Sequence, residues 1–563
     1  MRWCLFLLLA ALLPAQSTPE SGGTAATVPT ARLEGQVSSQ AGEPLRKATV
    51  RLEPYGGSRQ NAVAYTDTSD TNGNFVFETV TPGRYTLSAQ RSGFLMQNYG
   101  ARSAFNTGPG AVLTLAPGQA LKDLHFKLIP QGVITGRVVD SDGDPVQGAQ
   151  VRVMRMYRMR GQRGLVFMGG AGTDDQGDFR IANLSPGTYD VVADNMNSRM
   201  FGQYETIRAG RAPNRQSSVA TYYPSGLDAA SATPVEITPG SEVRGIEIQM
   251  RREAVYSIRG AVIDAATGKP VAANLNARSK VNPEFGLGMG ATNSKEDGTF
   301  ELRNLLPGAY FLAAASNNGL QGIASEEVTI ADSDITGLKL VLTEGAPMTG
   351  TIKIEGADPH TPSKNLPRST VMLAGVAGAM RAPSAQPKED GTFELRGVVP
   401  AKYVVNIFNV PDGMYVKSVR VGGQDASRTT LDLTSGVSGT LDILLSPHGA
   451  EVMGTVRNSD GEAQPGIQVT LWPKEMQPNS ALGGISISAT DQNGDFHVTG
   501  LAPGDYFVAA WEELEPGLSD DIDFLRRFTA QAVALTLEEG AHQAAQPKLI
   551  SREAAAVEAA KLP

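Results

Sequence analysis

Three residues in the last part of the chain have the types and spacing of a zinc site. His448 and Glu451 form a His-x-x-Glu pair, and His542 could supply a third ligand, which is the donor set of a zinc hydrolase. The pair lies in "PHGAEVMG", however, where corresponding segments read "IPQGVITG" and "TEGAPMTG" and lead from a linker into a strand. There is also no G-x-S-x-G motif for a nucleophilic serine. We therefore expect no catalytic residues, no metal site and no cofactor.

Oxygen-rich turns are a second place where chemistry could occur. The segments "DSDGDP" from Asp140 and "TDTSDTNGN" from Thr66 collect potential Ca²⁺ ligands. An EF-hand loop starting at Asp140 needs a glutamate at its twelfth position, but Val151 stands there. Turns favour Asp, Asn and Gly for backbone reasons. We interpret both segments as hairpin turns, with calcium between loops as the alternative.

The first residues have the pattern of a secretory signal. Residues 1–17 combine Arg2, an apolar run from Leu5 to Leu13 and small residues near a cleavage point. The run is too short for a bilayer about 30 Å thick. Cys4, the one cysteine, lies near the start of the expected signal. We expect an exported protein, periplasmic, cell-surface or extracellular, with no thiol and no transmembrane segment after signal removal.

Net charge and composition further limit the possible functions and the possible fold class. A net charge of −9 argues against binding nucleic acid through the overall field. The chain has 62 glycines, 34 prolines and 41% hydrophobic residues, which is typical of short strands joined by many turns.

A repeated peptide reveals the organisation of the chain. "KEDGTFELR" occurs at residues 295–303 and again at 388–396, and three similar copies occur elsewhere. In each copy a glycine precedes a phenylalanine by two positions, and a tyrosine follows that phenylalanine by ten. These residues are Gly73, Phe75 and Tyr85; Gly177, Phe179 and Tyr189; Gly298, Phe300 and Tyr310; Gly391, Phe393 and Tyr403; and Gly494, Phe496 and Tyr506.

The repeat defines the domains. About forty residues before each phenylalanine lies a short strand with a central glycine, at Gly35, Gly136, Gly260, Gly350 and Gly454. We predict five β-sandwich domains at residues 31–130, 131–252, 253–344, 345–446 and 447–550, arranged as a monomeric rod, with a tail at 551–563. Because an isolated helix of the tail's length is marginal in water, we expect the tail to be frayed.

The repeated residues suit a scaffold. Glycine tolerates the positive φ that a hairpin turn requires, and alternation turns Phe300 and Leu302 toward a core. After the Pro-Gly turn, Tyr310, Leu312 and Ala314 face inward as well. The tyrosine occupies the position of a tyrosine corner, whose hydroxyl bonds a nearby backbone group.

These segments carry a family resemblance. "GRVVDSDGDPVQGAQVRV" from Gly136 and "TDDQGDFRIANLSPGTYDVVA" from Thr173 resemble the carboxypeptidase regulatory-like domain, a transthyretin-like or prealbumin-like seven-stranded sandwich of a wider carbohydrate-binding-like group. The likeness runs from about Ala31 to Ile550 and is similar to that of multi-repeat secreted bacterial proteins. It is weakest in the fourth unit, which lacks a Pro-Val-x-Gly-Ala step and has Ala401 in place of a glycine. The resemblance implies an all-β array of Ig-like sandwiches that are not themselves catalytic.

A basic hairpin is one candidate binding surface. The segment "RVMRMYRMRGQR" carries Arg152, Arg155, Arg158, Arg160 and Arg163. Alternation puts Val151, Val153 and Arg155 on one side, so the pattern slips midway and the far end of the hairpin is expected to protrude. Arg155, Arg158 and Arg160 are the candidate contacts to an anionic polysaccharide or an acidic partner. The other interpretation is a solvated hairpin whose arginines pair with nearby Asp and Glu.

Aromatic residues of the last unit are the other candidate. Alternation places Ile467, Val469 and Leu471 in the core and turns Trp472 outward. On a second strand it turns Phe507 and Trp511 outward as well. Outward aromatic rings can stack on sugars, but the segment "EELEPGLSDDIDFLRRF" that follows could form a short helix that covers them. Both interpretations remain open.

Two functions follow from these patterns. The first is a non-catalytic, exported cell-envelope protein whose repeats act as a structural or protein-interaction scaffold. The alternative is a carbohydrate-binding protein that recognises polysaccharide through the aromatic face of its last domain. The expected partner is an envelope protein or a polysaccharide.

Overall fold

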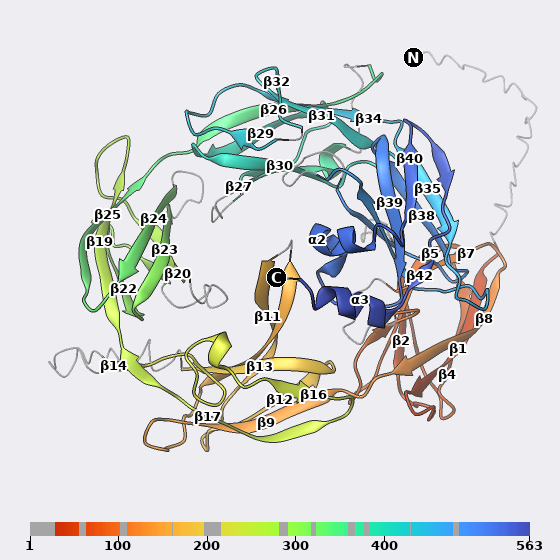
Figure 1. The fold of residues 1–563 in the computed structure, drawn as a ribbon, viewed down its shortest axis with the longest axis horizontal. Helices are drawn as coiled ribbons and strands as arrows, with labels where there is room; N and C mark the ends of the chain where they lie inside the picture. Colours follow the sequence, from red (N-terminus) through yellow and green to blue (C-terminus); the bar gives the residue numbers. More distant parts are fainter. Residues whose placement is uncertain are drawn as a thin grey trace, which may run out of the picture.

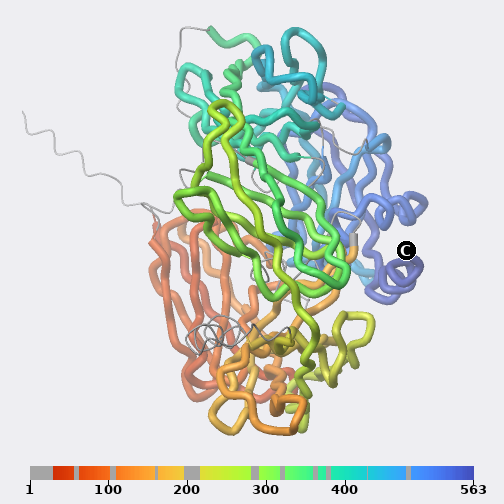
Figure 2. Tube along the Cα trace, turned by 90° about the vertical axis from the view of Figure 1, so that its left-hand side faces the viewer, coloured from red at the N-terminus to blue at the C-terminus, as the bar shows by residue number. Residues whose placement is uncertain are grey.

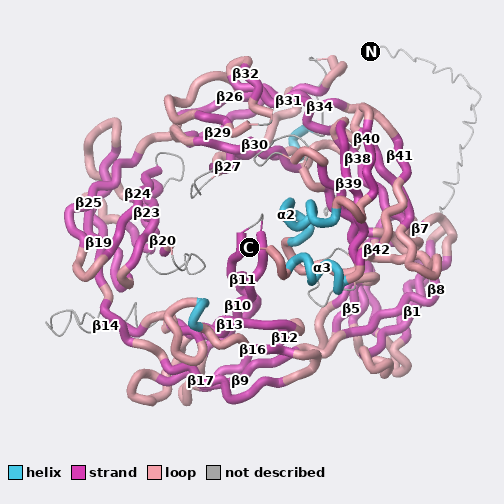
Figure 3. Tube along the Cα trace, viewed as in Figure 1, coloured by secondary structure: helices cyan, strands magenta, loops and turns pink. Residues whose placement is uncertain are grey.

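The computed structural model describes residues 29–55, 63–101, 110–159, 162–195, 216–280, 291–316, 323–358, 366–375, 382–427, 429–476 and 484–562. Strands dominate these ranges, and the helices α2 (Ile522–Leu525) and α3 (Arg552–Ala559) lie inside the ring of strands in the view of Figure 3. The expected signal at residues 1–17 lies outside the described residues.

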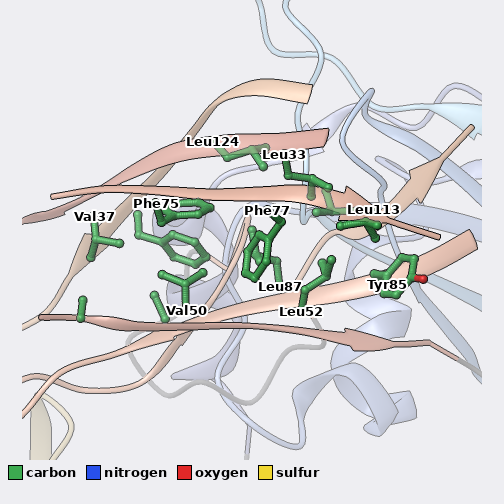
Figure 4. Packing of buried hydrophobic residues seen from close by; sticks show 14 of the residues in the cluster. Leu33, Val37, Val50, Leu52, Phe75, Phe77, Tyr85, Leu87, Leu113 and Leu124 are labelled. Atoms are coloured by element: carbon green, nitrogen blue, oxygen red, sulfur yellow. The ribbon is translucent and has the colours of Figure 1, made fainter. Parts of the chain in front are cut away.

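Five hydrophobic cores divide the chain into successive units, which we call units one to five. Each core lies between two β-sheets, so the all-β tandem array of sandwiches predicted from the sequence is confirmed. In unit one, Phe75, Phe77 and Leu33 point from one sheet toward Val50 and Leu87 on the other (Figure 4).

Units one and two show the common topology. Unit one has the sheets β4-β1-β8 and β3-β2-β5-β6, with β7 also on β5. Its strands are β1 (Ala31–Ser39), β2 (Thr49–Pro54), β3 (Tyr65–Thr68), β4 (Asn74–Val80), β5 (Gly83–Gln90), β6 (Gln97–Asn98), β7 (Val112–Leu115) and β8 (Ala120–Leu128). Unit two has the sheets β12-β9-β17 and β11-β10-β13-β15, with β16 also on β13. Its elements are β9 (Gly132–Val139), β10 (Gln150–Met159), β11 (Gln162–Gly172), β12 (Asp178–Leu184), β13 (Gly187–Asp194), β14 (Gln216–Ser218), β15 (Thr221–Tyr222), η1 (Ala229–Ser231), β16 (Val235–Ile237) and β17 (Glu242–Gln249).

Units three and four continue the array. Strand β18 (Arg252–Ala254) pairs with β14 between units two and three. Unit three has the sheets β22-β19-β25 and β21-β20-β23-β24. Its strands are β19 (Tyr256–Asp264), β20 (Ala273–Ser279), β21 (Ala291–Asn293), β22 (Thr299–Leu305), β23 (Gly308–Ser316), β24 (Ile323–Ile330) and β25 (Ile335–Leu342). Unit four has the sheets β29-β26-β34-β31-β32 and β28-β27-β30-β33. Its elements are β26 (Ala346–Ile354), η3 (Leu366–Arg368), β27 (Thr370–Gly375), β28 (Ser384–Ala385), β29 (Thr392–Val398), β30 (Lys402–Phe408), β31 (Tyr415–Val421), β32 (Gln424–Asp425), β33 (Leu431–Asp432) and β34 (Leu441–Ser446).

Unit five adds a helical cap to the sandwich. Its sheets are β38-β35-β41 and β37-β36-β39-β40, with β42 also on β39. Its strands are β35 (Ala450–Thr455), β36 (Gln468–Pro473), β37 (Ser486–Ala489), β38 (Asp495–Leu501), β39 (Gly504–Trp511), β40 (Val533–Leu537), β41 (His542–Ala544) and β42 (Leu549–Ile550). Between β39 and β40 lie the short helices η4 (Leu518–Asp520), α2 and η5 (Arg526–Phe528), which we call the cap.

The repeated glycines and aromatics occupy equivalent places in all five units. Each central glycine pairs across the sheet with the repeated phenylalanine: Gly35 with Phe75, Gly136 with Phe179, Gly260 with Phe300, Gly350 with Phe393 and Gly454 with Phe496. A Cβ atom at any of these glycines would collide with that ring and with a backbone oxygen. The phenylalanine therefore covers its partner glycine.

The expected tyrosine corner forms in every unit. Each tyrosine hydroxyl donates to the carbonyl oxygen four residues earlier, at 2.6 to 2.9 Å. The turn glycines have φ between 77° and 80° in four units and 74° in unit three. The architectural interpretation of the repeat thus agrees with the structure.

A buried hydroxyl is a further repeated feature, which was not predicted from the sequence. Six residues before the phenylalanine, a buried hydroxyl joins two strand ends in four units. In unit five, Thr490 Oγ1 accepts from Ile467 N at 2.9 Å and donates to Gln464 O at 2.6 Å. Ser69, Thr173 and Ser294 do the same in units one to three. Unit four, the weakest match to the repeat, has Pro387 at this position.

The units follow a closed circle (Figure 1). From the side, unit one and unit five are offset along the axis of that circle (Figure 2). The side chain of Gln492 in unit five accepts from Thr114 N and donates to Thr114 O of unit one, both at 3.1 Å. The rod expected from the sequence does not describe this arrangement, because contacts between the first and last units bend the array back on itself.

The tail was also predicted wrongly. Ser551 caps helix α3, and Ala555 and Leu562 are buried against the cap and the outer face of β39. Tertiary packing supplies the stability that a helix of this length lacks in isolation.

Candidate functional site

The long hairpin of β10 and β11 reaches the centre of the circle, where it meets the cap (Figure 1). Its register shifts between Val153 and Met154, which is the slip in alternation read from the sequence. Beyond this bulge the hairpin leaves its own sandwich and contacts unit five.

Arg155 stays within unit two. Its guanidinium lies 5.5 Å from the centre of the Tyr157 ring and 5.7 Å from that of Tyr189. It also donates to the carbonyl oxygen of Pro186 at 3.2 Å. Burial raises the pKa of Tyr157 and that of Tyr189, and the charge of Arg155 partly opposes both shifts. Arg155, one of the candidate ligand-binding residues, therefore supports the base of the hairpin.

Arg158 makes the contact with unit five. Its Nε lies 2.9 Å from Oδ2 of Asp521, and the two side chains are 10% and 0% exposed. Arg158 thus pairs with an acid, as in the second interpretation of this hairpin, but the pair is buried instead of solvated and Asp521 is 363 residues away in the sequence. Arg163 is exposed, and Arg160 lies outside the described residues.

Asp521 also forms hydrogen bonds within the cap. Its Oδ1 accepts from the backbone N of Asp523 at 3.0 Å and of Phe524 at 3.1 Å, so it is the N-cap of α2. One carboxylate thus joins the hairpin of unit two to the first turn of a helix in unit five.

Gly517 shows how closely the hairpin and the cap approach. A Cβ atom on Gly517 would overlap the carbonyl oxygen of Arg158, and the φ of this residue is +87°. Both the backbone conformation and the space require glycine.

The predicted aromatic face is present but enclosed. Trp472 and Trp511 turn away from the sandwich core, as alternation predicted, and are 0% and 1% exposed beneath the cap and α3. The Trp511 ring lies 4.9 Å from that of Phe528 and 5.5 Å from that of Phe524, and its Nε1 donates to Thr470 Oγ1 at 3.1 Å. Phe507 packs 5.7 Å from Trp472 and is partly buried. Of the two interpretations left open, the structure therefore favours covered packing over an open platform for sugars.

The zinc-like residues form a different cluster from the one considered in the sequence. Glu451 Oε2 lies 2.9 Å from His497 Nε2 and 3.3 Å from His542 Nδ1. The hydrogen bond with His497 holds the pKa of Glu451 below its usual value, and His542 adds to this effect. The described residues contain no group of three or more His, Cys, Asp or Glu arranged to hold a metal ion.

Turn geometry accounts for the candidate calcium segment at Asp140. Its Oδ1 accepts from the backbone N of Asp142 at 2.9 Å and of Asp144 at 3.0 Å. The carboxylate is thus used to shape the hairpin turn.

Unit five is also joined to unit four. Glu539 Oε1 accepts from Ser446 Oγ at 2.6 Å and from Tyr415 Oη at 3.0 Å, and lies 3.3 Å from Lys417 Nζ. These bonds hold the pKa of Glu539 below its usual value. Unit five thus contacts units one, two and four.

The family comparison bears on the first two units. Residues 32–128 and 133–219 match the family described as "Carboxypeptidase regulatory-like domain". A search of the curated proteins found no match. Among the described residues, no helix combines the length and the apolar character needed to cross a membrane.

Solved structures resemble the chain at low identity. The TIE protein of Bacillus anthracis is 12% identical, with 73% of this chain and 72% of that chain covered and a TM-score of 0.15. The minor pilin GBS52 of Streptococcus agalactiae is 13% identical, with 40% and 97% covered and a TM-score of 0.21. The major pilin subunit BcpA of Bacillus cereus is 10% identical, with 56% and 99% covered and a TM-score of 0.14. These scores are too low for a function to be transferred.

Proposed function

We propose that this chain, of which residues 32–128 and 133–219 match the carboxypeptidase regulatory-like domain, is a non-catalytic scaffold of the cell envelope. In this proposal the protein is exported, and its sandwiches hold or space another envelope protein. The N-terminal segment with the pattern of a secretory signal supports the export.

The main support for this proposal is the structural role of the repeated residues. In all five units the repeated glycine, phenylalanine and tyrosine serve a turn, a core and a backbone hydrogen bond. A repeated catalytic or sugar-binding site would instead place polar or aromatic side chains at an accessible surface. Repetition therefore supports a structural role for each sandwich.

Carbohydrate binding is less well supported. It would need Trp472 and Trp511 at the surface, yet both are enclosed by the cap and α3. A sugar could reach them only after these helices had moved away. The aromatic cluster is better explained as the core that fixes the cap on unit five.

A cross-linking experiment tests the scaffold. The full chain is incubated with an envelope fraction of its source cells, cross-linked, and its partners are identified, with the heat-denatured chain as control. We expect one or a few proteins to be captured reproducibly by the folded chain alone. Equal capture by the denatured chain would contradict the proposal.

Two further measurements separate the other function classes. In the first measurement, a panel of polysaccharides is added to the protein, and we expect the fluorescence emission of Trp472 and Trp511 to stay unchanged, because neither ring is accessible. In the second measurement, peptide and ester substrates are incubated with the protein, and we expect no hydrolysis. Saturable quenching would favour the carbohydrate-binding alternative, and turnover that disappears in His448→Ala would favour an enzyme.

A further inference from the structure

We infer that the β10–β11 hairpin is a latch that holds the array in its closed form and whose release opens the circle. This inference concerns the shape of the protein and does not depend on what the scaffold binds. It starts from a contact between units that are not neighbours in the sequence, made by Arg158 and Asp521.

The chemistry of this contact makes it depend on both partners. Asp521 is fully buried and the side chain of Arg158 nearly so. When one member of a buried ion pair is removed, the other is left as an uncompensated charge in a poorly solvated place. Loss of either charge therefore favours separation of the hairpin from the cap, because water can then reach the charge that remains.

The shape of the contact is specific as well. The carbonyl oxygen of Arg158 occupies the space above Gly517 where any side chain would lie. The hairpin backbone thus fits directly onto the cap, and the ion pair lies beside this fit. Two independent features, one steric and one electrostatic, point to the same docked arrangement.

The latch is also linked to the aromatic cluster. Asp521 binds Arg158 through one oxygen and caps α2 through the other. Helix α2 carries Phe524, which packs on Trp511. Docking of the hairpin and ordering of the cap therefore support each other.

Units one and five, which are also not neighbours in the sequence, meet at a second contact that we call the seam. The bonds between Gln492 and Thr114 are exposed, and such bonds exchange readily with water. Gly100 and Gly466 approach so closely that a Cβ on Gly466 would collide with the Gly100 carbonyl oxygen. The seam places unit one beside unit five, whereas the latch adds a buried ion pair between units two and five. Because all of these units belong to one chain, formation of either contact raises the effective concentration of the two partners of the other contact.

Small-angle X-ray scattering on the full chain tests the latch. The variants are Arg158→Met and Asp521→Asn, and Arg163→Met on the same hairpin is the control, because Arg163 is exposed. Asparagine is a good N-cap, so Asp521→Asn removes the charge but keeps an acceptor for α2. Units of about 100 residues have a radius of gyration of about 13 Å, so opening five of them from a circle into a line raises the value for the chain up to about 1.5-fold.

We expect the wild type and Arg163→Met to scatter as the closed form and the other two variants to expand. Emission from Trp472 and Trp511 and the circular dichroism spectrum show whether unit five and the sandwiches remain folded. Gly517→Ala offers a second route, since it blocks docking without changing charge. A wild type that already scatters as an open array would overturn the inference. So would Arg158→Met and Asp521→Asn chains that stay as compact as the wild type.

Discussion

Gly454 lies directly opposite Phe496 in the antiparallel pair of β35 and β38, and the phenylalanine ring covers the glycine. The same relationship recurs in every unit. A side chain at the glycine would meet both the ring and a backbone oxygen of the neighbouring strand. The sheet therefore requires glycine at one position and an aromatic ring at the other.

Gly454→Ala should destabilise unit five. A Cβ atom would lie 2.9 Å from Phe496 Cε1 and would collide with the Ala545 carbonyl oxygen. Overpacking of this kind costs about 1 to 3 kcal/mol. Denaturant unfolding followed by Trp472 and Trp511 emission measures the loss. Gly484→Ala is the matched control, because no atom lies within 4 Å of its Cβ position, and an equal loss in both variants would contradict the explanation.

Tyr506→Phe should remove the tyrosine corner of unit five while keeping its ring. The lost hydrogen bond runs from Tyr506 Oη to Ala502 O at 2.9 Å, and a bond of this type contributes about 0.5 to 1.5 kcal/mol. The midpoint of the tryptophan-detected unfolding transition should fall accordingly. Tyr310→Phe changes the same bond in unit three and should leave that transition unmoved, because Trp472 and Trp511 both lie in unit five.

Thr490→Val should cost more than Tyr506→Phe. The two side chains have nearly the same shape, but valine leaves Ile467 N and Gln464 O without the hydroxyl that they share. An unsatisfied buried polar group costs about 1 to 3 kcal/mol. Thr490→Ser keeps the hydroxyl and should restore most of the stability, and failure of this rescue would argue for a packing effect instead. Chemical denaturation measures all three chains.

Phe524→Ala should loosen the cap over the tryptophans. Phe524 is fully buried against Trp511 and Phe528, and truncation of such a residue costs about 3 to 5 kcal/mol. We expect the emission to shift to longer wavelength and acrylamide quenching to increase. Strong quenching of the wild type would show that the aromatic face is open after all.

Stability should depend on pH through Glu451. Because its hydrogen bond with His497 lowers its pKa below the ordinary value of 4.5, the folded state favours the ionised form. The resulting stabilisation is present above about pH 4.5 and is lost as the pH falls through the lower folded-state pKa. The difference in unfolding midpoint between the wild type and Glu451→Gln should therefore shrink below pH 4.5. Glu475→Gln, at an exposed position in the same unit, should not reproduce this dependence.

The spacing of residues along the sequence was enough to predict the hydrophobic core of each unit. A period of two assigned Phe300, Leu302 and Tyr310 to the core of unit three, and all three are buried there. The same period turned Trp472 and Trp511 away from the core of unit five. These features depend on backbone geometry and on neighbours a few residues away, so a single sequence carries them. The hydroxyl of Thr490 belongs to this class too, since its spacing from Phe496 repeats in three other units.

Only the tertiary structure decided how the units meet. Neither Arg158 nor Asp521 has a local signature of its partner, because the hairpin and the cap are brought together by the path of the whole array. The cover over Trp511, the docking of α3 and the closed circle have the same origin. Alternation states which side of a strand a residue faces, but whether water or another unit lies on that side depends on the relative orientation of units distant in the sequence.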